Sequence, residues 1–115
     1  MKNYSKTHTA YESRTELHDT LNLTGCEISK NTLCEGTNVP FVHSHKNNEE
    51  IYYIVSGKGY ALLDNEKVEL NEGDFIKVNP ICKRQIFAKT KLTYICIQVR
   101  TNSLEGYTLT DAIVE

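Results

Sequence analysis

Short runs of apolar and β-branched residues follow one another along most of the chain. From Cys26 onward these runs are separated, at intervals of roughly eight to twelve residues, by Gly, Asn, Asp or Pro. The runs are CEISKNTLC, PFVHSH, EIYYIVSG, GYALLD, KVEL, DFIKVN, RQIFA and LTYICIQV. The segments between them are too short to contain the helices that connect parallel strands, so the pattern predicts an all-β fold.

Turn residues and the strand interiors refine this prediction. Asp64, Asn65 and Glu66 tolerate tight-turn backbone angles and predict a hairpin within ALLDNEKVEL, and Gly73 marks the next corner. In EIYYIVSG and LTYICIQV, apolar residues occupy both alternating sets of positions. Such strands are expected to be covered on both faces, as in a closed barrel or a sandwich.

The two ends of the chain differ from the middle. Residues 1–24 hold few large apolar side chains and are predicted to form an arm, in which ELHDTLNL could make a short helix or strand on the outside of a barrel spanning 25–100. Residues 101–115 form a tail that carries apolar residues, predicted to pack on the barrel or on a second subunit: Leu104, Tyr107, Leu109, Ile113 and Val114. Because a lone barrel leaves strand edges and this tail uncovered, we expect a homodimer.

Composition excludes several classes of partner. The chain has 115 residues, enough for one domain, and a net charge of -2 without a long basic run, so a nucleic-acid partner is not expected. No stretch resembles a signal peptide or a membrane span, which favours a cytoplasmic protein without a membrane partner. The cysteines are widely spaced and are expected to be reduced: Cys26, Cys34 and Cys96 as small packed hydrophobes, and Cys82 as a packed loop residue or a thiol at a pocket rim.

The candidate chemistry lies in His43-Ser-His45-Lys-Asn-Asn-Glu49-Glu50. Residues two apart in a strand project to the same face, so His43 and His45 can point at one ion, and a turn after them brings Glu49 or Glu50 alongside. Two imidazoles and one carboxylate leave coordination positions open and suit one divalent transition metal such as Zn, Fe, Mn or Ni. The alternative interpretation is a pair of surface histidines beside a loop.

This stretch resembles the first motif of the cupin superfamily, in which His-x-His is followed by three or four residues, Glu, six residues and Gly. Counting six residues back from Gly57 selects Glu50 as the carboxylate ligand, with Glu49 as its outward neighbour. The resemblance covers about residues 25–100. It implies a small single-domain cupin with a jelly-roll barrel, also called a double-stranded β-helix, that binds a metal.

The second motif of the family is altered. It begins at Gly73, passes Pro80 and ends with a histidine ligand in most cupins, but Arg84 occupies that position here. Arginine does not ligate metals, although it can hold a carboxylate or phosphate with two parallel hydrogen bonds, so Arg84 is a candidate to orient an anionic ligand. Alternatively, the side-chain oxygen of Gln85 is a weak fourth metal ligand, or Arg84 makes an ordinary surface salt bridge.

Two further residues and two functions complete the predictions. Tyr52 and Ile54 are in phase with Glu50 and are expected to face the same cavity. Tyr52 is a candidate catalytic proton donor or a simple wall residue, and Ile54 is expected to contact a bound ligand. One hypothesis is a metal-dependent oxygenase, isomerase or lyase acting on a compact anionic or oxygen-rich small molecule. The other is a non-catalytic binding or sensory cupin with a structural metal.

Overall fold

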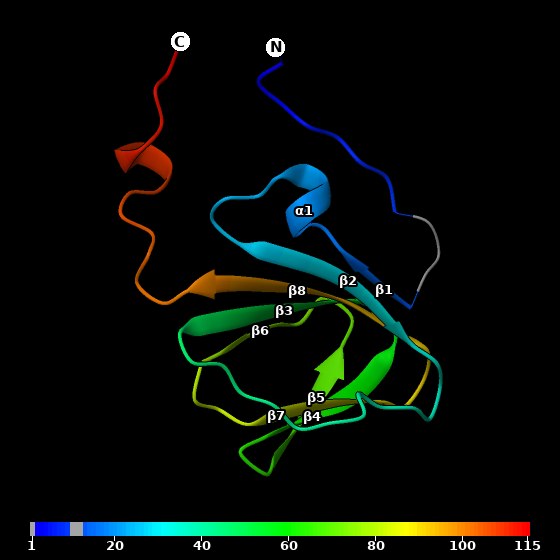
Figure 1. The fold of residues 1–115 in the computed structure, drawn as a ribbon. Helices are drawn as coiled ribbons and strands as arrows, with labels where there is room; N and C mark the ends of the chain where they lie inside the picture. The colour runs from blue at the N-terminus through cyan, green and yellow to red at the C-terminus, as the bar shows by residue number, and fades with distance from the viewer. Residues whose placement is uncertain (1, 10–12) are drawn as a thin grey trace.

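The structure is a computed structural model that describes residues 2–9 and 13–115, and residues 1 and 10–12 of the predicted arm lie outside the described part. Figure 1 shows strands throughout, with little helix. The elements are β1 (Arg14–Glu16), α1 (His18–Leu21), β2 (Glu27–Leu33), β3 (Asn48–Ser56), β4 (Lys58–Leu63), β5 (Glu66–Asn71), β6 (Phe75–Val78), β7 (Arg84–Ala88), β8 (Leu92–Arg100) and the 3-10 helix η1 (Thr108–Thr110).

The strands form two antiparallel sheets that enclose one core. One sheet has the order β1-β2-β8-β3-β6 and the other has the order β5-β4-β7 (Figure 1). The buried apolar side chains come from both sheets: Tyr52, Ile54, Ala61, Leu70, Val78, Ile86, Ala88, Leu92, Tyr94 and Cys96. The predicted all-β jelly-roll barrel is therefore confirmed.

Alternation along β3 decides which side chains reach the interior. Glu50, Tyr52 and Ile54 are buried, whereas Ile51 and Tyr53 between them are only partly covered. This is the two-residue period of a strand whose inner face packs against the opposite sheet. The inner face is covered as predicted, but within this chain the apolar outer face is left partly open.

Two turns hold the strands in register. Asp64 and Asn65 have φ angles of 50° and 69°, and Leu63 pairs with Glu66, so they form the two-residue hairpin turn that the sequence predicts. Gly57, between β3 and β4, has a φ of 90°. A Cβ atom there would lie 1.9 Å from the backbone oxygen of Lys91, so only glycine fits this crossing between the sheets.

The predicted arm is partly built into the larger sheet. β1 pairs antiparallel with β2 and places Arg14 opposite Asn31. The Glu27 carboxylate accepts hydrogen bonds from the backbone amides of Leu17 and His18, which fixes the start of α1. The arm thus brings one cationic side chain, that of Arg14, to the sheet.

The tail leaves β8 and runs away from the barrel, toward the side where the N-terminus also lies (Figure 1). Its large apolar side chains are exposed, among them Leu109, Ile113 and Val114 at 87%, 85% and 90%. Whether the tail packs on the barrel or on a second subunit stays a prediction.

The cysteines are free thiols, but they are not equally buried. Cys96 is buried on β8 and Cys26 is partly covered, whereas Cys34 is exposed. The expectation that Cys34 packs inside was wrong because β2 ends at Leu33, one residue earlier. No helix within residues 2–9 and 13–115 is long and apolar enough to cross a membrane.

Candidate metal centre

Backbone pairing with the second-motif region positions the two histidines. His43 and Arg84 form an isolated antiparallel bridge, in which each backbone amide donates to the carbonyl oxygen of the other residue. The backbone amide of His45 donates to the carbonyl oxygen of Pro80. The predicted strand around PFVHSH is thus reduced to a bridge, but it still holds both histidines on the same side of the site.

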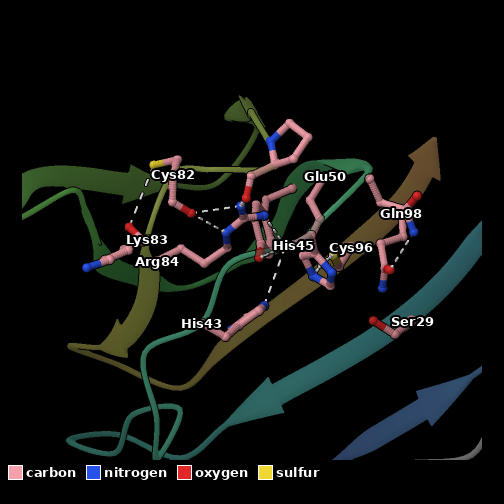
Figure 2. Close-up of polar contacts among 12 residues, drawn as sticks. Ser29, His43, His45, Glu50, Cys82, Lys83, Arg84, Cys96 and Gln98 are labelled. Carbon is pink, nitrogen blue, oxygen red and sulfur yellow. Dashed lines mark hydrogen bonds and ion pairs between the residues drawn. The ribbon is translucent and has the colours of Figure 1, made fainter. Parts of the chain in front are cut away.

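Glu50 completes the group from the inner face of β3. The ligand atoms of His43, His45 and Glu50 lie within 4.8 Å of one another. His43 Nε2 is 3.8 Å from Glu50 Oε1, and His45 Nε2 is 3.2 Å from Glu50 Oε2. Figure 2 shows the two imidazoles on the same side of Glu50. Glu49 is the outward neighbour and is not part of this group of described residues.

The Glu50 carboxylate is held by hydrogen bonds on both oxygens. Oε1 accepts from the Tyr52 hydroxyl at 2.5 Å and from Arg84 Nη1 at 2.7 Å. The Cys96 thiol donates to Oε2 at 3.4 Å. Burial by itself would raise the pKa of Glu50, but the hydrogen bonds from Tyr52, Arg84 and Cys96 outweigh it and the pKa lies below its usual value. The carboxylate is therefore ionised at neutral pH.

Arg84 is a buried brace for this carboxylate. Its side chain is 1% exposed, and Figure 2 shows it extending from β7 between Glu50 and the preceding loop. Nη2 donates to the carbonyl oxygens of Asn79, Pro80 and Cys82, and Nε donates to Cys82 as well. The interpretation as a surface salt bridge was therefore wrong, and the carboxylate that Arg84 binds is that of Glu50.

His43 has the protonation state that a metal requires. Burial lowers the pKa of His43, more than the attraction of Glu50 raises it. The buried Nδ1 of His43 has no hydrogen-bond partner among the described residues. Two imidazoles beside an ionised carboxylate are a donor set for a divalent transition metal, and the three residues fit one ion.

The remaining predicted site residues lie near this group or behind it. Tyr52 reaches Glu50, and burial raises the pKa of its hydroxyl far above the ordinary range. Gln85 lines the same cavity, but its amide donates to the carbonyl oxygen of Val39 at 2.7 Å. Ile54 is fully buried in the core and is not among the described residues that line the cavity, which departs from the expected ligand contact.

A cavity of about 450 Å³ opens beside the three candidate ligands. Its lining also includes Ser29 and Asn31 of β2 together with Arg14 of β1, residues that the sequence did not single out. The Asn31 amide donates to Ser29 Oγ at 3.0 Å, and Arg14 Nη1 donates to Asn31 Oδ1 at 2.7 Å. Polar residues at alternate positions inside the run CEISKNTLC were the available signal, because both are buried.

The fold and this site agree with comparisons to known proteins. The family model of the cupin domain matches residues 32–97. More than half of the chain is covered, so the protein belongs to the cupin family. Many cupins hold a divalent metal, and His43, His45 and Glu50 could hold one here.

Three relatives illustrate the range of similarity. A crystal structure of a cupin protein from Bacteroides fragilis is 55% identical, with 100% of this chain and 99% of that chain covered and a TM-score of 0.96. A predicted oxalate decarboxylase from Thermotoga maritima is 25% identical over 65% of this chain and 64% of its own, with a TM-score of 0.57. An uncharacterized protein from Methanocaldococcus jannaschii is 51% identical over 39 residues, which are 34% of this chain and 31% of that relative.

Proposed function

We propose that this cupin is a metal-dependent enzyme of the oxygenase, isomerase or lyase type that acts on a compact anionic or oxygen-rich metabolite. The observation that carries the proposal is the position of the three candidate ligands on the wall of a 450 Å³ cavity. That volume suits a small molecule. A metal that only braced the barrel would not need to face a cavity.

His43, His45 and Glu50 would hold the metal, and the ion would act as a Lewis acid toward an oxygen atom of the bound molecule. The residues around the centre hold Glu50 in the orientation and charge state that a metal ligand needs. Arg84 and Tyr52 hold Glu50 ionised and fixed, so the carboxylate loses little freedom when it ligates. Tyr52 is then a positioning residue, because its hydroxyl proton is already donated to Glu50, and this argues against its predicted role as a catalytic acid.

Arg14 is the residue best placed to hold an anionic group of the substrate. Both arginines line the cavity, but Arg84 is neutralised by Glu50 and its donors are occupied by backbone carbonyls. Arg14 is oriented by Asn31 and by Glu16 Oε1 at 3.2 Å, and its side chain is still 53% exposed. The role first assigned to Arg84 therefore passes to Arg14. The 25% identity to a predicted oxalate decarboxylase supports a small carboxylate as the substrate class.

The test compares two neighbouring glutamates. Protein stripped with a chelator and reloaded separately with Fe, Mn, Ni or Zn is assayed against small hydroxy and keto acids, with O₂ uptake and proton NMR as readouts. Glu50→Gln is expected to lower both metal content and turnover by at least roughly tenfold, since it removes a ligand. Glu49→Gln, on the outer face, is the matched control and should keep both. Full metal content and turnover in Glu50→Gln would refute the proposal.

Arg14→Gln separates binding of the substrate from binding of the metal. It should raise KM about tenfold or more, with metal content unchanged, because a charged hydrogen bond to the substrate is lost. An unchanged KM would remove Arg14 from the site. The alternative, a non-catalytic sensory cupin, is supported if small acids raise Tm in the metal-loaded protein but none is converted. A homodimer and a cytoplasmic location stay predictions.

A further inference from the structure

The five-stranded sheet carries an apolar patch on the face that points away from the core. We call it the outer isoleucine face and define it as Ile51, Tyr53, Phe75, Ile95 and Ile97. In the sheet register Ile51 lies opposite Ile97, and Tyr53 lies opposite both Ile95 and Phe75. Phe75 is 70% exposed and stacks on Tyr53 at 4.5 Å between ring centroids. An antiparallel sheet with one face in water normally carries polar residues there, so this face calls for a cover.

The tail is the second uncovered apolar element of the same chain. Leu109, Ile113 and Val114 are 87%, 85% and 90% exposed, and Leu104 and Tyr107 are exposed as well. Exposure of so many large apolar residues within fifteen positions is costly in water, because each of them stabilises a fold only when it is buried. Tail and face do not meet within one chain, since the tail runs away from the barrel (Figure 1).

The path of the tail is shared with a crystal structure. The Bacteroides cupin superimposes with a TM-score of 0.96 over 100% of this chain, a match that extends over the fifteen residues 101–115. A tail that keeps this course without packing on its own barrel can be supported by a second molecule. The shared course therefore favours a docked tail.

Charge points to the occupant of the face. The tail carries Glu105, Asp111 and Glu115 and no Lys or Arg after Arg100. The outer isoleucine face is bordered by Lys77 beside Ile51 and Lys30 beside Ile95 in the register, and by one acid, Glu49, two residues before Ile51. An acidic, apolar strip thus matches an apolar face whose border has a net positive charge.

We propose that the outer isoleucine face of each chain is the docking site for the tail of a second copy. The exchange is reciprocal, with each tail on the partner's face, so two copies close into a symmetric dimer and leave no open end. The proposal is independent of the metal centre. It goes beyond the expected homodimer by naming the two surfaces that meet, the tail of one chain and the outer isoleucine face of the other.

Light scattering after size exclusion tests it on the full chain, at about 10 μM, where a dimer of micromolar or better affinity is populated. The wild type should have twice the chain mass of 13.1 kDa. The tail variant carries Ile113→Asp and Val114→Asp, and the face variant carries Phe75→Asp. Each should weaken the dimer at least roughly tenfold and elute as a monomer, since buried apolar contacts are replaced by charge. Ile81→Asp is the matched control, because Ile81 is 85% exposed outside both surfaces, and it should stay dimeric.

Mixing the tail variant with the face variant is the decisive experiment. A mixed dimer retains one intact tail on one intact face, so the mixture should recover dimer that neither variant forms alone. Contacts of tail with tail, or of face with face, would not be repaired in this way. Far-UV circular dichroism establishes that every variant is folded. A monomeric wild type, a tail variant as dimeric as the wild type, or a mixture of folded variants that stays monomeric would each overturn the proposal.

Discussion

Replacement of Arg84 by methionine tests whether the buried arginine is a brace for the metal centre. Methionine keeps much of the length of the side chain but removes all five donors. The Glu50 carboxylate, whose side chain is 4% exposed, would lose its ion-pair partner at 2.7 Å. The carbonyl oxygens of Asn79, Pro80 and Cys82 would lose their donor at the same time.

The magnitude follows from burial of the pair. Breaking a buried ion pair from one side costs about 3 to 5 kcal/mol, because the remaining charge is left uncompensated. Tyr52 still donates to Glu50 and water can enter from the cavity, so we expect about 3 kcal/mol at pH 7, the lower end of that range. For a domain of this size the loss should lower Tm by more than about 10 °C.

Chemical denaturation of the chelated protein, followed by circular dichroism, measures this loss without a contribution from bound metal. Arg100→Met, at the exposed end of β8, is the matched control and should change stability by less than about 0.5 kcal/mol. Adding Glu50→Gln to Arg84→Met should cost less than the sum of the single changes, because no unpaired charge remains. A loss below about 1 kcal/mol for Arg84→Met, or strict additivity in the cycle, would refute the role of Arg84 as a brace.

Three further predictions concern the rest of the barrel. Gly57→Ala should cost about 2 kcal/mol or more in denaturant unfolding, because φ is 90° and the new Cβ would meet the Lys91 carbonyl. Burial raises the pKa of Tyr94 to about 12, so its neutral hydroxyl stabilises the fold below pH 10, and that contribution is lost as the pH rises toward 12. The free energy of unfolding of Tyr94→Phe should therefore fall less steeply between pH 10 and 12 than that of the wild type. An identical slope of unfolding free energy against pH would contradict the argument. A thiol reagent should modify Cys34 at once and Cys96 only after unfolding, and equal rates in the native protein would contradict their different burial.

Alternation along single strands was enough to predict an all-β barrel or sandwich and the pairing of His43 with His45, whereas the jelly-roll barrel and the third candidate ligand came from the resemblance to cupins. The two-residue period placed Tyr52 on the same face as Glu50, and the spacing that the cupin motif requires before Gly57 favoured Glu50 over Glu49. The same period correctly placed Ile54 on the inner face of the sheet. It does not say how far along the strand the cavity extends. Ile54 lies in the core between the sheets, beyond the cavity wall.

Contacts between distant segments could not be predicted in this way. Arg14 and Asn31 meet because β1 pairs with β2, and the isolated sequence of a polar arm does not indicate which strand it joins. The partner of Arg84 was missed for a related reason. The guanidinium reaches Glu50 only because the loop ahead of β7 curves around it and offers carbonyl oxygens at 2.8 to 2.9 Å.

Position 84 explains how a centre with three ligands can be retained in this barrel. Where the family usually has a fourth ligand, Arg84 binds Glu50 and the loop instead, so the residue changes from a ligand to a support for a ligand. The support has a chemical consequence, since a buried carboxylate fixed beside a guanidinium stays ionised without a metal. A centre with one protein ligand fewer also leaves one more position for the bound molecule, whose other end would then face the polar wall of Arg14 and Asn31. For the proposed enzyme, an arginine at this position would therefore suit a two-ended anionic substrate better than a closed structural metal site.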